Sequence, residues 1–135
     1  MGQLNNRTAQ EVLDEHLKLS NAWKDEAEMW RNFSEDLRRN FSEDCLVLTN
    51  RGIFRGHEGV RELVEMEVAQ MFADEMAHGG SFQYITKVVE GRMGFLEWAY
   101  EDANVKIRDG ADSYLIEDGK VVAQTIHYTV EAKQS

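Results

Sequence analysis

The sequence predicts an α+β domain in which N-terminal helices pack on a strongly curved antiparallel sheet, forming a cone with an internal pocket. Apolar residues repeat at helical spacing through the first half of the chain. From Ser81 onward the pattern changes to runs rich in β-branched and aromatic residues, separated by Gly, Asp and Asn. Helices followed by a meander of strands are typical of an α+β fold, because the helices then cover one face of the sheet.

Length and composition limit the domain organisation and the partners. The chain has 135 residues, which fits one domain, expected over 8–135 after a disordered or extended segment 1–7. The formal net charge of −10 disfavours nucleic acid and membrane surfaces as partners, since both attract basic patches. No apolar run suits a membrane helix and no signal peptide is visible, so with Cys45 as the single cysteine we expect a cytoplasmic protein.

Two helices are predicted before residue 42. Thr8 and Glu11 have the spacing of a capping box, in which each side chain binds a backbone N–H of the other residue. Behind them Val12, Leu13 and Leu17 share one helical face with His16. A break at residues 20–21 precedes a second apolar stripe, which consists of Trp23, Ala27, Trp30, Phe33, Leu37 and Phe41.

The remaining elements follow in order. A strand over 45–49 and a return strand over 53–55 flank a turn. The helical pattern is clearest over 56–77, and two glycines end it. Four strands are then predicted over 82–89, 93–100, 105–116 and 121–130. Asp118-Gly119 between the last two predicts a type I′ hairpin, because both residues accept positive φ angles.

The last hairpin gives a testable register. A two-residue turn pairs Glu117 with Lys120, Tyr114 with Ala123 and Asp112 with Thr125. One face then carries Asp112, Tyr114, Ile116, Val121, Ala123, Thr125 and His127. The other carries Ser113, Leu115, Val122, Gln124, Ile126, Tyr128 and Val130. The second face is more apolar and is expected to turn inward, unless a bulge at Gly110 exchanges the faces.

Several segments resemble proteins of the SnoaL-like, or nuclear transport factor 2-like, superfamily. Residues 40–49 (NFSEDCLVLT) are similar to their helix-to-strand passage, and residues 52–61 (GIFRGHEGVR) to their short hairpin before the third helix. The most specific likeness is that of residues 109–130 (DGADSYLIEDGKVVAQTIHYTV) to their last two strands. The resemblance implies the cone fold but no single function, since the fold serves isomerases, cyclases, epoxide hydrolases, dehydratases and binding domains.

The resemblance does not carry the mechanism of ketosteroid isomerase. Thr49 stands where that enzyme has its general base, at the end of the first strand, and Leu17 and Leu19 occupy the region of its oxyanion-binding tyrosine. A threonine hydroxyl is too weak an acid to carry protons near neutral pH. We therefore do not expect the ketosteroid reaction.

Two functions are compatible with the sequence. The first is a binding module that holds a small apolar molecule without chemistry, and we favour it because no proton-transfer pair is recognisable by spacing. The second is a cofactor-free acid/base enzyme, an isomerase, cyclase or hydratase acting on a small polyketide- or terpenoid-like compound. Titratable groups at the floor of the cone would favour the enzyme.

The candidate residues follow from these two functions. In an enzyme, Glu97, Asp112 and His127 would transfer protons, although Glu97 lies in an apolar strand and we favour an outward orientation for it. Structural roles for Asp112 and His127 are an open alternative. Ligand contacts are expected from Trp23, Trp30, Trp98, Tyr114, Gln124 and Tyr128.

No metal or cofactor is expected, and a homodimer is. His16, His57 and His78 lack the spacing of a ligand set, and there is no phosphate-binding or dinucleotide motif. Helices can cover only one face of the sheet, and neither set of alternating residues is uniformly charged. We therefore expect the outer face to pair two copies of the chain.

Overall fold

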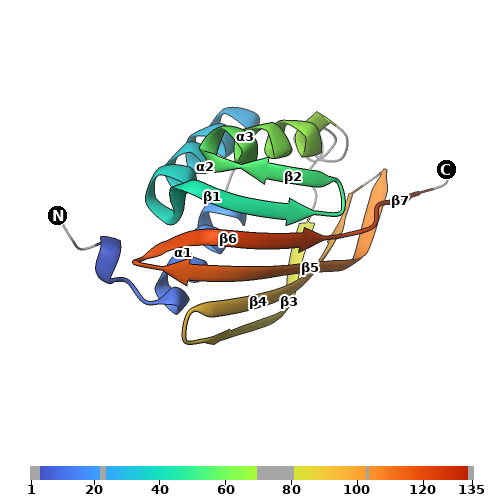
Figure 1. Cartoon of the computed structure of the whole chain (residues 1–135). Coiled ribbons are helices and arrows are strands. Elements are labelled where there is room, and N and C mark those ends of the chain that lie inside the picture. The colour runs from blue at the N-terminus through green and yellow to red at the C-terminus, as the bar shows by residue number, and fades with distance from the viewer. Residues whose placement is uncertain (1–3, 22–23, 70–80, 103, 134–135) are drawn as a thin grey trace.

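The chain packs three α-helices against one side of a curved, unclosed sheet over the residues that the computed structural model describes, which are 4–21, 24–69, 81–102 and 104–133 (Figure 1). In chain order the elements are η1 (Leu4–Asn6), α1 (Ala9–Asn21), α2 (Glu26–Asn40), β1 (Phe41–Thr49), β2 (Gly52–Arg55), α3 (Gly56–Glu67), β3 (Ser81–Glu90), β4 (Met93–Glu101), β5 (Val105–Glu117), β6 (Lys120–His127) and β7 (Glu131–Ala132). The predicted α+β fold is confirmed.

The sheet is mixed, so the expectation of an antiparallel sheet is wrong at one place. Its strand order is β2-β1-β6-β5-β4-β3, and β7 pairs with β5. β1 and β6 run parallel, while the other neighbours are antiparallel. Hairpin turns set the direction of the antiparallel pairs, whereas β1 and β6 are joined by most of the chain and no local pattern announces their pairing.

The first two helices begin with side-chain caps. The capping box is confirmed: the Glu11 N–H donates to Thr8 Oγ1 at 3.2 Å and the Thr8 N–H donates to Glu11 Oε1 at 2.8 Å. Asp25 caps α2 by accepting from the Glu28 N–H at 2.8 Å. Phe41, expected at the end of the α2 stripe, instead has extended backbone and opens β1.

Two predicted elements differ in extent from the observed ones. The helix predicted over 56–77 is confirmed over Gly56–Glu67, and residues 70–80 lie outside the described part of the chain. The segment 1–7, expected to be disordered or extended, contains the short turn η1. Arg7, which follows η1, is hydrogen-bonded to α1, to α2 and to the β5–β6 turn.

The β5–β6 hairpin has the predicted turn but a different register. Asp118 and Gly119 have φ of 52° and 73°, as a type I′ turn requires. The pair Glu117–Lys120 is confirmed, but a bulge follows in β6, so Tyr114 pairs with Gln124 and Asp112 pairs with Ile126. One extra residue exchanges the faces of a strand. The inner face therefore combines members of both predicted sets.

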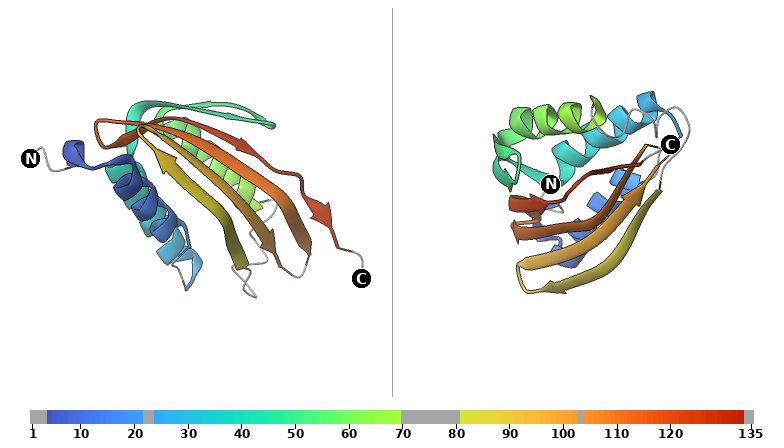
Figure 2. Two further views of the ribbon diagram at one scale, coloured as in Figure 1. Left: turned by 90° about the horizontal axis from the view of Figure 1, so that it is seen from below. Right: turned by 90° about the vertical axis from the view of Figure 1, so that its right-hand side faces the viewer.

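The core lies between the helices and the concave side of the sheet. Figure 2 shows the strands bending around the side on which α1, α2 and α3 pack. The fully buried residues of the core include Leu13 of α1, Val47 of β1, Ile107 of β5 and Val121 of β6. α3 packs on β1 and β2, α1 contacts β3 to β6, and a cavity lies between the helices and the sheet.

Candidate functional site

A cavity of about 200 Å³ lies between the three helices and the concave face of the sheet. Its walls are mostly apolar and include Leu17, Met29, Phe33, Val60, Leu63 and Leu96. Several polar side chains also reach it, among them His16, Asp36, Glu67, Asp112, Tyr114 and Gln124. Titratable groups thus stand inside an apolar cavity, where electrostatic interactions are stronger than in water.

Asp112 of β5 forms the polar floor of this cavity. Its Oδ1 accepts from Trp98 Nε1 at 2.9 Å, and its Oδ2 accepts from the Tyr114 hydroxyl and from Gln124 Nε2, each at 3.1 Å. Burial raises the pKa of the Asp112 carboxyl, and the three donors oppose that shift. A buried carboxylate with donors from three adjacent strands is held in one orientation.

A glycine makes room for this arrangement. The Trp98 indole lies across Gly110 on the neighbouring strand, so that a Cβ at position 110 would meet the ring at 2.2 Å. The register of β4 against β5 also shifts beside this pair. Gly110 was expected as a bulge position, and the close approach of the indole gives the physical reason for glycine there.

His16 of α1 and Asp36 of α2 form a buried pair at the cavity wall. His16 Nδ1 lies 2.7 Å from Asp36 Oδ2, and the imidazole edge packs on the rings of Phe41 and Tyr114. Desolvation acts to lower the pKa of His16, but the adjacent Asp36 and the charge of Asp112 outweigh it, so the pKa is raised. No residue that the structure describes makes a hydrogen bond to His16 Nε2. That nitrogen is available to a molecule in the cavity.

A second acid/base pair joins α3 to the end of the sheet. The Tyr128 hydroxyl donates to Glu67 Oε2 at 2.9 Å, and the Arg51 guanidinium lies 4.0 Å from the centre of the Tyr128 ring. Burial raises the pKa of Glu67 to about 7, against the opposing effect of the Tyr128 hydrogen bond. Glu67 therefore exchanges protons near neutral pH.

Four predicted site residues line the cavity together. They are Asp112, Trp98, Tyr114 and Gln124. Tyr128 stands next to them, because its ring contacts Trp98 at 5.6 Å between centroids and its hydroxyl binds Glu67. The bulge in β6 brings Gln124 to the same face as Asp112 and Tyr114, which the predicted register had separated.

Three other predicted residues, Glu97, His127 and Trp30, do not join this group. Glu97 is exposed on the outer face of β4, which fits the favoured orientation but not proton transfer in the cavity. His127 is exposed on the outer side of β6, 3.6 Å from Asp109. The Trp30 ring packs against the ring of Phe33, but Trp30 does not itself line the cavity. Trp23 and His78 lie outside the described residues.

Sequence reasoning missed Asp36 and Glu67 and gave His16 no role. His16 and Asp36 each precede a buried leucine, and Glu67 lies one helical turn after the buried Leu63. That position was a usable signal, because a titratable group on a buried face needs a partner. The partner itself was not readable, since Asp36 is 20 residues from His16 and Tyr128 is 61 residues from Glu67.

Two negative findings apply to the described residues. No three of their His, Cys, Asp and Glu side chains gather in a way that could hold a metal ion. None of their helices combines the length and the apolar composition needed to cross a membrane.

Comparison with known proteins identifies the fold. No family model and no curated protein matches the sequence. In structure the chain is similar to an NTF2-like protein of unknown function from Burkholderia xenovorans, with 13% identity, a TM-score of 0.66 and coverage of 94% of this chain and 87% of that one. It is also similar to a protein from Mesorhizobium loti provisionally described as a SnoaL-like polyketide cyclase, with 15% identity, a TM-score of 0.63 and coverage of 90% and 100%.

A designed protein is also similar in structure. A de novo protein with a curved β-sheet matches at 15% identity and a TM-score of 0.64, covering 90% of this chain and 84% of that one. The chain thus shares its fold with NTF2-like and SnoaL-like proteins. Its activity must be argued from the residues in the cavity.

Proposed function

We propose that this protein is a cofactor-free acid/base enzyme that acts on a small, largely apolar molecule, with His16 as the proton-transferring group. The observation that carries the proposal is the His16–Asp36 pair, whose free nitrogen Nε2 borders the cavity. The sequence favoured a binding module because spacing revealed no such pair. The pair arises from two different helices, and its presence supports the enzyme.

The geometry suggests how the proton would move. Neutral His16 accepts a proton at Nε2 from a C–H or O–H group of the substrate, and Asp36 stabilises the imidazolium that forms. The imidazolium, whose N–H exchanges with solvent, then gives a proton to another atom of the substrate, so that the reaction is balanced without a cofactor. Glu67, with its pKa of about 7, is suited to a second proton transfer in the same cavity.

The floor and the size of the cavity restrict the substrate. Asp112 and Gln124 offer polar contacts for a hydroxyl or carbonyl group, while the walls fit apolar carbon. A cavity of about 150 Å³ holds benzene, so the 200 Å³ available here fits a single substituted ring. We therefore propose a one-ring polyketide- or terpenoid-like substrate, too small to be a steroid.

Isotope exchange tests this proposal without knowledge of the true substrate. The protein is incubated in D₂O with single-ring ketones, enones and epoxides, and deuterium incorporation or ring opening is followed by mass spectrometry. We expect acceleration by the wild type and a loss of about 10²–10⁴-fold in His16→Gln, the range for a lost general acid or base. His127→Gln is the matched control, because it removes a histidine of an exposed His–Asp pair and should change nothing.

The opposite outcome would favour the binding module. If no compound reacts faster than in buffer, or if His16→Gln reacts as fast as the wild type, His16 is not a catalytic residue. The mostly apolar walls would then point to storage or transport of a small apolar molecule. Mass spectrometry of whatever molecule leaves the denatured protein would identify it.

We further propose that two copies of the chain pair through the outer face of the sheet. Large apolar side chains are exposed on β1 to β4, namely Leu48, Ile53, Ile85, Val88, Met93 and Phe95. They form two groups, one on β1 and β2 and a larger one on β3 and β4, which β6 and β5 separate in the sheet. Exposed apolar groups of this kind mark an interaction surface.

A further inference from the structure

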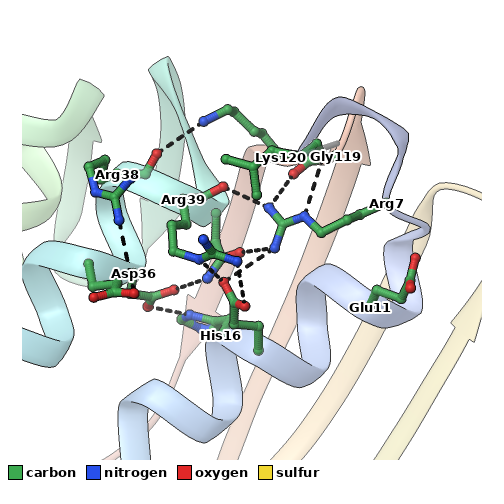
Figure 3. Close-up of polar contacts among 12 residues, drawn as sticks. Arg7, Glu11, His16, Asp36, Arg38, Arg39, Gly119 and Lys120 are labelled. Carbon is green, nitrogen blue, oxygen red and sulfur yellow. Dashed lines mark hydrogen bonds and ion pairs between the residues drawn. The ribbon is translucent and has the colours of Figure 1, made fainter. Parts of the chain in front are cut away.

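Arg7 is held between the N-terminal turn, two helices and the last hairpin. Its guanidinium donates to the carbonyls of Arg39 at 2.7 Å and Gly119 at 2.9 Å, and to Asn40 Oδ1 at 2.9 Å (Figure 3). Its side chain is 13% exposed, and Glu15 lies 3.3 Å from one of its nitrogens. An arginine with this many partners has one fixed position.

The β5–β6 turn holds the segment that carries Arg7. The Leu4 carbonyl passes directly over Gly119, where a Cβ would meet its oxygen at 1.8 Å. Gly119 also has φ of +73°, which side chains rarely adopt. Both conditions require glycine at this position, and the contact fixes residues 4–7 against the hairpin.

From Arg7 a chain of hydrogen bonds runs to the cavity. Asn40, which is fully buried at the end of α2, donates from Nδ2 to Asp36 Oδ1 at 2.7 Å. Asp36 Oδ2 in turn lies 2.7 Å from His16 Nδ1. Figure 3 shows Arg7, Asp36 and His16 along this path. Two side chains, Asn40 and Asp36, therefore lead from the fixed guanidinium to the proposed proton carrier.

The donors in this chain can point only one way. A guanidinium has donors and no acceptor, so Asn40 must turn its oxygen to Arg7 and its amide nitrogen to Asp36. Asp36 Oδ1 is then an acceptor, and its carboxyl has Oδ2 free to accept from His16 Nδ1–H. The neutral imidazole consequently carries its proton on Nδ1 and leaves Nε2 basic.

We propose that Arg7 and Asn40 are positioning residues that fix the tautomer of His16 and so keep a base facing the cavity. Without Asn40, the buried Oδ1 of Asp36 would lack a donor and would favour a protonated carboxyl. A protonated Asp36 can donate to Nδ1, and the imidazole proton then sits on Nε2. This inference rests on the proposed function for its purpose, but the tautomer itself can be observed without a substrate.

Nuclear magnetic resonance of the full chain with ¹⁵N-labelled histidine tests the tautomer. The four histidines give separate long-range ¹H–¹⁵N correlations, and His16→Gln identifies the signals of His16. In the wild type we expect neutral His16 to be protonated on Nδ1 alone. In Asn40→Leu we expect a mixture of tautomers and a higher pKa of His16, because the Asp36 carboxylate loses a donor and the His16–Asp36 pair then holds the added proton to higher pH. Arg7→Gln should change the tautomer mixture and the pKa of His16 in the same way as Asn40→Leu.

Arg39→Gln is the matched control. Arg39 lies beside Arg7 but its guanidinium binds Glu15, at 2.7 and 3.0 Å, and is not part of the chain to Asp36. Its loss should leave the tautomer unchanged. Arg7→Lys, which keeps a charged donor, should restore part of the wild-type spectrum. If Asn40→Leu does not fold, Arg7→Gln and Arg7→Lys decide the question.

Each outcome separates this inference from the proposed function. An unchanged tautomer and an unchanged His16 titration in the folded Arg7 and Asn40 variants would overturn the inference, even if the cavity proves catalytic. A changed tautomer in a protein that transforms no compound would support the positioning chain and overturn the enzyme. If both hold, the pH profile of turnover should shift with the titration of His16 in Asn40→Leu and not in Arg39→Gln.

Discussion

Two His–Asp pairs of this protein have the same chemistry and opposite surroundings. The His16 and Asp36 side chains are 13% and 6% exposed and lie 2.7 Å apart inside the helix–sheet space. The His127 and Asp109 side chains are 59% and 47% exposed and lie 3.6 Å apart on the outer side of the sheet. Water and salt screen the outer pair, whereas the inner pair interacts in a medium of low polarity.

The neighbours of the two aspartates explain the difference in role. Asp36 also accepts from the Asn40 amide, so both of its oxygens serve a network that ends at the cavity. Asp109 accepts from the backbone N–H and the hydroxyl of Thr129, both at 2.8 Å, and these bonds lower its pKa. Asp109 thus fixes the chain after β6. The residue types of a pair do not reveal its function, but the remaining partners of the carboxylate do.

The largest expected effect is on stability. His16→Ala leaves Asp36 buried with one partner lost and opens a void, and we expect it to lower the free energy of unfolding by about 3–5 kcal/mol. His127→Ala should cost less than about 1 kcal/mol, the usual range for an exposed pair. Urea unfolding at neutral pH measures both. Equal losses in the two variants would mean that burial does not distinguish the pairs.

The comparison also shows which parts of the site were predictable. Asp112, Trp98 and Tyr114 were predicted as site residues from their types, but the predicted register turned Asp112 and Tyr114 outward. The register was predicted correctly next to the turn, where two residues determine it. From Leu115 away from the turn the predicted register was wrong, because β6 has an extra residue, Val122, at a bulge. Val122 lies in a run of apolar residues, and nothing in that run indicates a bulge.

The helical half of the site was not predictable for a different reason. The pattern of α1 gave its buried face, whereas the predicted stripe of α2 shares only Leu37 with the buried residues of that helix. The contact of His16 with Asp36 depends on how the two helices cross. The parallel pairing of β1 with β6 is of the same kind. In both cases the partner is set by packing over long sequence distances, which periodicity within one segment does not contain.

An effect of intermediate size is expected in the pH dependence of the free energy of unfolding. The pKa of Glu67 is raised from 4.5 to about 7 in the folded state, so its contribution to stability is full below pH 4.5 and is lost as the pH rises to about 7. Between these values the unfolded chain is ionised and the folded chain keeps its proton, which lowers the free energy of unfolding by about 1.4 kcal/mol per pH unit. The raised pKa of His16 acts in the same direction.

Matched variants isolate the contribution of Glu67. Urea unfolding between pH 4.5 and 8 should show a shallower decline with pH in Glu67→Gln than in the wild type. Glu97→Gln removes an exposed carboxylate from the outer face and should leave the slope unchanged. If both variants keep the wild-type slope, Glu67 does not take up a proton in the folded state.

The smallest expected effect is on association of two copies of the chain, and it depends on the two faces of β4. Leu96 of β4 is buried against the helices, whereas its neighbour Phe95 is 39% exposed on the outer face. If that face pairs two copies, Phe95→Lys should weaken association by about 2 kcal/mol, or roughly 30-fold, the threshold effect of an interface hot spot. Arg38→Glu, which changes an exposed charge on α2, is the control and should leave association unchanged.

Sedimentation equilibrium over micromolar concentrations tests whether two copies of the chain associate. A species near the 15.6 kDa mass of one chain at all concentrations would contradict the dimer. If the dimer forms, His127 on the same outer face loses part of its water, and His127→Ala should then cost more at concentrations above the dissociation constant than below it. The loss of unfolding free energy in His16→Ala should be the same above and below the dissociation constant, because the surroundings of His16 come from one chain.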